Sequence, residues 1–253
     1  MPRRLTIRPL EKVWGSADTE PWYRNWGALK IGEIWFEGPV LVKFLFTSDN
    51  LSVQVHPGDE YARTHENGSA GKTEMWHVLR AEPGARIAIG LKQAETAERV
   101  REAALSGEIV DLLRWVEVRA GETYFLPAGT IHAIGAGLAL CEVQQFSDVT
   151  YRLYDFGRGR ELHVEKVLDV ANFVPYDGFV PRHGNVLAEC AYFRVERALV
   201  NGSAMLEGDL CIALEGEGTF GGMQFAPGDG FEGPGMVESP GAVFLVTGVK
   251  PRT

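Results

Sequence analysis

The chain has 253 residues, of which 45% are hydrophobic and 23% charged, a composition typical of a soluble globular protein with a substantial core. Its length allows one large domain or two small ones. No stretch approaches the roughly 18 apolar residues of a membrane-spanning helix, so we expect no membrane role. The net charge of −9, without a cluster of Lys and Arg, argues against nucleic acid as a partner.

The cysteine usage and the N-terminal residues indicate a cytosolic protein. Cys141, Cys190 and Cys211 are widely spaced and odd in number, which argues against a disulfide framework or a zinc site built from cysteines. Arg3 and Arg4 are not followed by an apolar segment, so no secretory signal peptide is indicated. We therefore expect a cytoplasmic enzyme or a cytoplasmic binder of small molecules.

Taken in chain order, the first half consists mainly of predicted short strands. Residues 29–55 contain three β-rich runs separated by Gly, Pro, Ser and Asn, and further runs are spread over 75–146. Helical periodicity is confined to 92–105, to a short continuation at 108–114 and to 161–171. This pattern predicts a mainly β protein, either a sandwich or a barrel, with a few short helices.

A proline-containing turn segment at 174–185 predicts a linker, and strand signals resume after it. We therefore expect two units: residues 1–173, with a helical insertion at about 92–114, and a smaller β unit, residues 174–253.

The two units share a faint internal echo. Residues 119–129 and 226–235 each place a glycine and an acidic residue before an aromatic residue and a Pro/Gly turn. Duplication of one β-barrel unit explains this similarity, although ordinary hairpin turns give similar strings. The second copy has no histidine after His183, so any metal chemistry is expected in the first unit.

Two short motifs put polar side chains on predicted strand faces. Ser52, Gln54 and His56 point to one side, and the intervening valines point to the other. A solvent-facing edge strand would give the same pattern. Lys72 and Glu74 form a Lys-x-Glu pair, which is usually a surface ion pair of little energetic weight. His77 lies on the opposite face from Glu74, so we expect a packing or surface histidine rather than a ligand.

The most specific motif lies at 121–132. Gly121, Pro127, Gly129 and His132 fit the pattern G-x5-P-x-G-x2-H, the second signature of the cupin barrel, at every fixed position. A strand enters, a Pro/Gly turn reverses it, and the histidine starts the return strand as an inward-facing metal ligand.

The rest of the cupin pattern is kept less well. Gln54 stands where the first signature has a histidine, and the leading glycine of that signature is absent. Ala136 replaces the asparagine expected after the second signature.

Gln54, His56, Glu74 and His132 together supply two imidazoles, one carboxylate and one amide oxygen. Such donors suit Zn²⁺ in a site that keeps an open position, where the ion acts as a Lewis acid toward a substrate oxygen. Without Gln54, the other three match the two-histidine, one-carboxylate triad of non-haem Fe(II) enzymes.

Four ordered segments closely resemble the type I mannose-6-phosphate isomerases (phosphomannose isomerases) in their short bacterial form. With Trp14-Gly15 and residues 32–37, these segments cover roughly residues 10–170; they are 51–62, 71–79, 125–137 and 145–158. The resemblance implies a cupin fold, a double-stranded β-helix or jelly-roll barrel. It further implies a bicupin whose second barrel, after about residue 175, is degenerate.

By position, the resemblance implies one Zn²⁺ per chain, with Gln54, His56, Glu74 and His132 as its ligands. It also implies roles in catalysis for the arginine of the last segment, the lysine of the Lys-x-Glu motif and a nearby carboxylate, which are Arg152, Lys72 and Asp148.

The implied substrate is a small sugar phosphate, whose phosphate needs cations in an acidic protein. Lys72 and Arg152 are the expected substrate contacts, with Ser52 as a hydrogen-bond donor and Arg158 or Arg160 as outer candidates. Local positive potential must outweigh the net charge at this pocket.

The implied activity interconverts mannose 6-phosphate and fructose 6-phosphate through a cis-enediol intermediate. The permanent charge of Arg152 suits an oxygen that becomes anionic. Asp148 is the expected general base, with Glu74 or a metal-bound water as alternatives. Two other functions stay open, a non-haem iron cupin dioxygenase and a non-catalytic sugar-phosphate-binding cupin.

Overall fold

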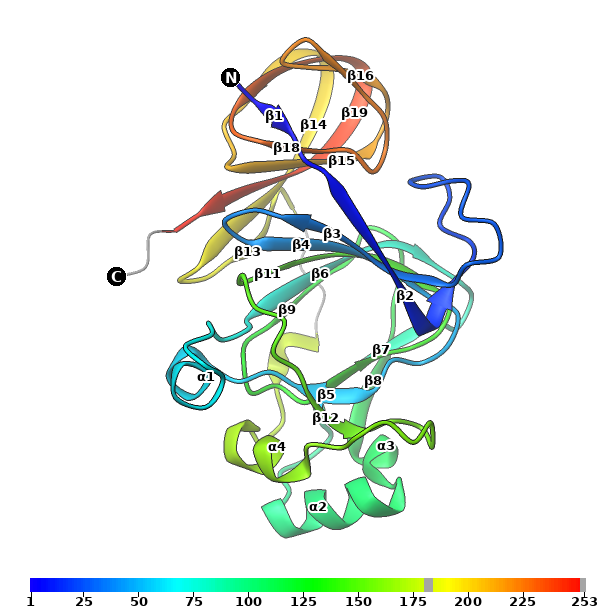
Figure 1. The fold of residues 1–253 in the computed structure, drawn as a ribbon, viewed down its shortest axis with the longest axis vertical. Helices are drawn as coiled ribbons and strands as arrows, with labels where there is room; N and C mark the ends of the chain where they lie inside the picture. The colour runs from blue at the N-terminus through cyan, green and yellow to red at the C-terminus, as the bar shows by residue number, and fades with distance from the viewer. Residues whose placement is uncertain (180–183, 251–253) are drawn as a thin grey trace.

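The computed structural model describes residues 1–179 and 184–250 and confirms a mainly β protein with short helices. Figure 1 shows two β units along the long axis, with helices α2, α3 and α4 at the end opposite the second unit. The fold is of the cupin type, with a second, C-terminal barrel.

Two antiparallel sheets form the first unit. The larger runs in the order β2 (Ile7–Ser16), β3 (Ile31–Glu37), β4 (Leu41–Thr47), β11 (Leu138–Gln144), β6 (Glu74–Ala81) and β9 (Thr123–Leu126). The smaller runs in the order β12 (Tyr151–Tyr154), β5 (Val53–Val55), β10 (His132–Ile134), β7 (Arg86–Leu91) and β8 (Leu113–Glu117).

The predicted helices form on the outer side of the smaller sheet. Helix α2 (Ala97–Ser106) begins after Thr96, whose side chain accepts the amide of Arg99, and ends at Gly107, whose φ of 90° favours glycine. Helices α3 (Ile109–Leu112) and α4 (Val164–Val170) lie within the other two predicted helical segments, 108–114 and 161–171. Helix α1 (Asp59–His65) was not predicted, because its seven residues are too few to show a clear helical period.

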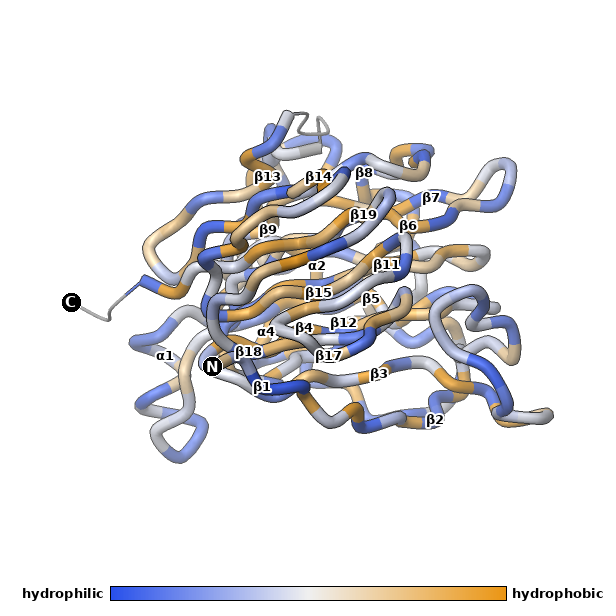
Figure 2. Tube along the Cα trace, turned by 90° about the horizontal axis from the view of Figure 1, so that it is seen from above, coloured by the Kyte–Doolittle hydropathy of each residue, from blue (hydrophilic) through white to orange (hydrophobic). Residues whose placement is uncertain are grey.

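The second unit is built around a long antiparallel pair of strands, β14 with β19. Its strands are β13 (Val186–Glu189), β14 (Phe193–Leu206), β15 (Leu210–Glu215), β16 (Gly218–Phe220), β17 (Met223–Phe225), β18 (Gly230–Glu232) and β19 (Gly235–Val249). The short 3-10 helix η1 (Asp177–Phe179) precedes them and lies against β7 and β9 of the first unit. Figure 2 shows hydrophobic stretches along the strands of the second unit. Strand β1 (Arg3–Arg4) pairs with β18, so the first residues of the chain complete this sheet. The division at 173/174 stays a prediction; part of the predicted linker, 180–183, lies outside the described residues.

The larger sheet is covered on both faces. Its outer face packs against the second unit in one apolar cluster that joins Phe36 and Phe44 to Ile212 and Leu245. This explains why β4 is buried at every position rather than at every second one. The inner face, together with the smaller sheet, encloses the site described below.

Replacing Phe44 by alanine is expected to lower the free energy of unfolding by about 3–5 kcal/mol, because the ring is fully buried where the two units meet. Phe146→Ala is the control, since that side chain is 48% exposed. Urea titration followed by tryptophan fluorescence measures both. Equal, small losses in the two variants would contradict a shared core.

None of the helices in the described part of the chain is long and apolar enough to cross a membrane. The three cysteines are free, as predicted.

Candidate functional site

Two rows of polar side chains face each other inside the first unit. The first crosses the smaller sheet: Arg152 on β12 lies opposite Gln54 on β5, which lies opposite His132 on β10. Residues directly opposite on adjacent strands point to the same face. Side chains separated by up to 98 positions in the sequence are thereby placed side by side.

The second row crosses the larger sheet. Trp35, Lys43, Glu142 and Trp76 are consecutive partners on β3, β4, β11 and β6. The ring centroids of Trp76 and His132 lie 5.3 Å apart in a T-shaped contact, which joins the two rows.

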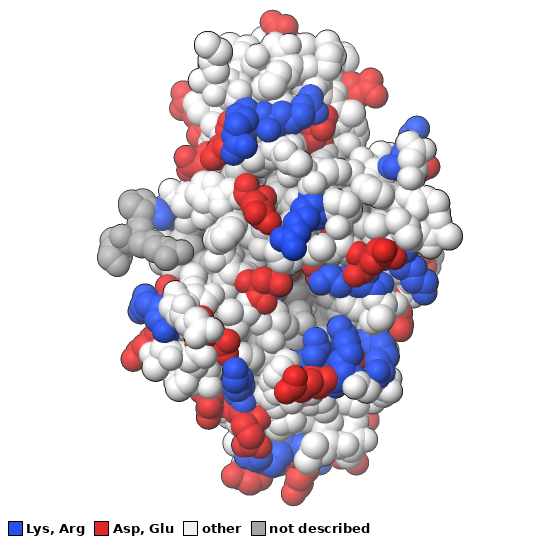
Figure 3. Space-filling model, viewed as in Figure 1, with Lys and Arg blue, Asp and Glu red and all other residues white. Residues whose placement is uncertain are grey.

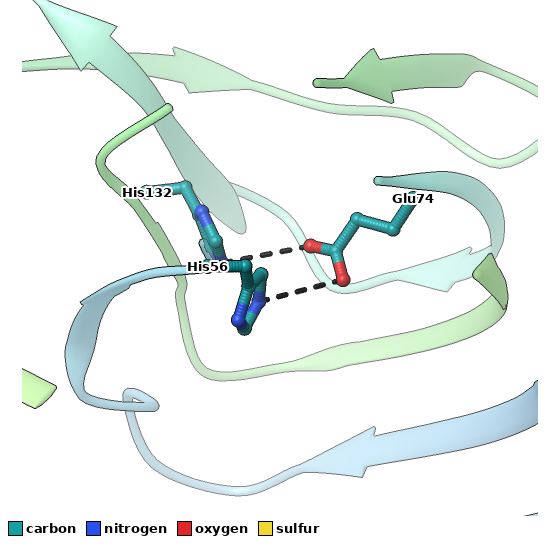
Figure 4. Close-up of side chains that lie close together, drawn as sticks. All are labelled: His56, Glu74 and His132. Atoms are coloured by element: carbon teal, nitrogen blue, oxygen red, sulfur yellow. Dashed lines mark ion pairs between the residues drawn. The ribbon is translucent and has the colours of Figure 1, made fainter. Parts of the chain in front are cut away.

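Three potential metal ligands converge at the buried end of the rows. His56, Glu74 and His132 are at most 2% exposed, and their ligand atoms lie within 4.8 Å of one another. The Nε2 atoms of His56 and His132 each lie 3.5 Å from a different oxygen of Glu74. Figure 4 shows both imidazoles turned toward that carboxylate.

Backbone carbonyls fix the orientation of both imidazoles. Nδ1 of His56 lies 2.9 Å from the carbonyl of Val149, and Nδ1 of His132 lies 2.9 Å from that of Thr130. A proton on each Nδ1 leaves the lone pair of Nε2 directed at Glu74. Burial, reinforced by Lys72, lowers the pKa of both imidazoles, that of His132 to about 4, so both are neutral at pH 7.

The carboxylate of Glu74 fits a cation. Neither of its buried oxygens has a hydrogen-bond partner of good geometry among the described residues, although the ammonium of Lys72 lies 2.7 Å from one of them as an ion pair. Two imidazoles held by hydrogen bonds at Nδ1, together with a carboxylate whose oxygens lack well-placed hydrogen-bond donors, are ligands that suit a divalent ion. The three residues therefore form a candidate metal centre.

Gln54 is close enough to be a fourth donor. Its Nε2 lies 3.2 Å from Nε2 of His132, and its Oε1 lies 3.3 Å from the hydroxyl of Ser52. Rotating the side-chain amide of Gln54 by 180° exchanges Oε1 and Nε2. The oxygen then points to the candidate metal position between the histidines and Glu74, and the hydroxyl of Ser52 accepts the amide N–H. Ser52 and Gln54 thus share a face, as the sequence predicted.

A cavity of about 270 Å³ lies beside this cluster. Its charged lining consists of Lys12, Lys43, Lys72, Arg152, Arg160, Glu33, Glu142 and Asp148, and Ser52, Gln54 and Thr150 also contribute to its wall. Figure 3 shows the hollow, with Lys and Arg gathered beside it. Five cations against three carboxylates give the lining a positive balance despite the net charge of −9.

The arginines expected at the site separate into two groups. Arg152 lines the cavity and donates from Nη1 to the carbonyl of Glu161 over 2.7 Å; Arg160 lines it as well. Arg158 does not line the cavity; its guanidinium is bound to Asp155 and to the carbonyl of Asn50. Arg160 is also bound to Asp155, from Nε over 2.7 Å, but it does line the cavity.

Lys43 and Glu142 belong to the cavity but were missed by the sequence analysis. Each is buried, and each lies in an otherwise apolar strand. A charged residue at a core position of such a strand is the signal that would have revealed them. Glu142 accepts the indole N–H of Trp76 at 2.9 Å and lies 3.8 Å from both Lys43 and Lys72.

Asp148 lies at the edge of the cavity, where Lys43 binds it at 2.8 Å. Burial alone would raise the pKa of Asp148, but Lys43 holds it below its usual value. Burial and the nearby Glu74 raise the pKa of Glu142. The two carboxylates therefore differ in basicity.

His77 points away from the cluster, as the strand alternation predicted. Its Nδ1 lies 2.8 Å from the hydroxyl of Thr123, and the side chain is buried near the second unit.

Comparison with known proteins places the chain in a family. No protein-family model matches the chain. The chain is 41% identical over 198 residues to the Bacillus subtilis mannose-6-phosphate isomerase ManA, covering 71% of this chain and 62% of that protein. Across the curated relatives that it matches, the chain spans 57–62% of their length.

Solved structures match over nearly the whole chain. A crystal structure of the mannose 6-phosphate isomerase from Bacillus subtilis has a TM-score of 0.85 at 26% identity, covering 97% of this chain and 99% of that one. A zinc-bound mannose 6-phosphate isomerase has a TM-score of 0.77 at 16% identity, covering 99% and 100%, which supports the fold alone.

The double barrel and the buried His–Glu–His cluster define a cupin-type protein with a candidate metal centre. The sequence relatives narrow this class. The chain belongs to the mannose-6-phosphate isomerase family.

Proposed function

We propose that this protein is a metal-dependent aldose–ketose isomerase that interconverts mannose 6-phosphate and fructose 6-phosphate, in the cytoplasm. The main support is the cavity, whose lining carries five cations and which lies beside the candidate metal centre. The names of the sequence relatives supply the reaction.

For the metal we propose one Zn²⁺ per chain, held by Gln54, His56, Glu74 and His132. The donor set and the zinc-bound structural relative support this choice. Bound there, the ion supplies Lewis-acid stabilisation to a substrate oxygen.

For Arg152 we propose direct stabilisation of the cis-enediol(ate), the high-energy species of this reaction. Proton transfer between C2 and C1 leaves negative charge on oxygen. A guanidinium carries a permanent charge and a rigid fork of donors that can hold two oxygens. The Nε of Arg152 is buried and makes no hydrogen bond to the described residues, so a donor remains for the substrate.

The proton transfer also needs a base, and two carboxylates of the cavity qualify by position. The role of Asp148 stays a prediction, and its lowered pKa makes it the weaker base. Glu142 is the candidate that the contacts favour, because it is buried among charged groups and its pKa is raised. Lys43 then pairs with Asp148 and keeps it ionised.

The substrate is proposed to contact Arg152, Lys72 and Ser52. Lys72 is 3% exposed and is bound to both Glu74 and His56, which places it near the reacting carbons rather than at the outer end. Carboxylates raise its pKa against the effect of burial, so it stays a cation. Arg160 also contributes to the positive lining.

A coupled assay that follows fructose 6-phosphate formation from mannose 6-phosphate tests the function. We expect turnover under anaerobic conditions, loss after treatment with a chelator, and recovery with one equivalent of Zn²⁺. Oxygen consumption that requires Fe(II) would instead support the dioxygenase. Sugar-phosphate binding without turnover at any metal loading would leave a binding protein.

A further inference from the structure

Arg152 lies on β12, the edge strand of the smaller sheet; within the described part of the chain this strand pairs on one side only, with β5. An edge strand leaves the outward peptide groups without a neighbouring strand. In this strand one residue, His163, supplies hydrogen-bond partners to both the backbone N–H and the backbone carbonyl of Arg152. The backbone N–H of Arg152 donates to Nδ1 of His163 over 3.0 Å, and the backbone N–H of His163 donates to the carbonyl of Arg152 over 2.7 Å.

We propose that His163 is a positioning residue, which holds Arg152 in register with Gln54 and His132 and so aims its guanidinium into the cavity. This proposal rests on the proposed function, in which Arg152 contacts the reacting oxygens. The segment before His163 supports it. The carbonyl of Glu161 accepts Nη1 of the same arginine over 2.7 Å, so one short segment fixes Arg152 at both its backbone and its side chain.

The segment is itself anchored. His163 directly precedes helix α4, whose Val167 is fully buried against the smaller sheet. Glu66, at the end of α1, accepts the hydroxyl of Tyr151 over 2.8 Å and binds Lys166 on α4 at 2.6 Å. Strand β12 and α4 are thereby tied to the same carboxylate, which keeps the imidazole against the strand.

The contact requires a neutral imidazole with its proton on Nε2, so that Nδ1 can accept. The charged groups around it are Arg152 on β12, Glu161 on its own segment, Lys166 on α4 and Glu66 directly after α1. Burial, followed by Arg152, lowers the pKa of His163 below its ordinary value. Above that pKa the acceptor is intact; below it, protonation removes the acceptor and adds a cation beside Arg152.

Two substitutions of His163 distinguish the effect of its hydrogen bond to Arg152 from the effect of its size. His163→Phe keeps a ring without an acceptor, whereas His163→Asn puts an oxygen where Nδ1 lies and cannot titrate. In the zinc-loaded protein we expect Phe to lower kcat about tenfold to a hundredfold, because small misplacements of catalytic groups are costly. The kcat of His163→Asn should stay within about threefold of that of the parent. In its pH profile of kcat, the decline at acid pH that comes from protonation of His163 should be missing. His65→Phe, an exposed histidine stacked on Tyr61, is the control.

Zinc content and hydrogen exchange at the Arg152 amide are measured on the same proteins. Faster exchange in the Phe variant only, with zinc retained in both, supports the contact. Parental kcat and exchange in the Phe variant would overturn it, as would equal loss of kcat in both variants. If the parent lacks isomerase activity, the proposed function fails, and the exchange data still decide the role of His163 at Arg152.

Discussion

His132→Ala is expected to lose tightly bound zinc and at least about a hundredfold in kcat, with the fold retained. The residue starts β10 at the point where Gln54, Glu74 and Trp76 meet. Loss of a group that only orients a ligand already costs about 10–100-fold in affinity or activity, and loss of the ligand itself should cost more. Without a bound metal ion, the carboxylate of Glu74 still has the ammonium of Lys72 as an ion-pair partner, at 2.7 Å.

Metal content by mass spectrometry and kcat by the coupled assay measure this effect. His77→Ala is the matched control, because His77 is also buried but lies on the other face of β6. That variant should lose stability while keeping zinc and activity. Full zinc occupancy in His132→Ala, or equal zinc loss in both variants, would remove His132 from the metal centre.

Arg152→Ala should lower kcat by about 10²–10³-fold, with zinc content unchanged. A fixed cation beside a developing oxyanion contributes that much to catalysis in a buried site. Arg152→Lys should recover little of the loss, because an ammonium keeps the charge but cannot hold two oxygens with a rigid fork or reach the carbonyl of Glu161 in the same geometry.

Arg158→Lys is the control for this experiment. Arg158 is also close in sequence, but its guanidinium is bound to Asp155 and is not part of the cavity wall. Its kcat and KM should stay near those of the parent. Similar losses for Arg152→Ala and Arg158→Lys would mean that the segment, rather than one guanidinium, matters.

The sequence predicted the class of fold because short alternating strands, turn residues and the cupin signature all pointed to a β-barrel. It did not reveal β1, because two exposed arginines carry no strand pattern of their own. The pairing of β1 with β18 depends on a contact between residues 229 positions apart, which local patterns cannot encode.

Among the candidate metal ligands, His132 was accessible to sequence reasoning through a motif with fixed spacing, whereas the full set of four was implied by the resemblance to the family. His56, Glu74 and His132 do converge. Lys43 and Glu142 were hidden because a strand buried on both faces gives no alternation to mark its inward side. The pairing of β4 with β11, a property of the assembled sheet, places them side by side in the cavity wall.

The pairing of β1 with β18 also has a consequence during synthesis. The segment around Arg3 is made more than 200 residues before its partner Glu232. At about 5–20 residues per second, this interval is on the order of tens of seconds. The early segment must wait in an unpaired state on the ribosome, so a chain stalled before β18 would expose that tail to proteases.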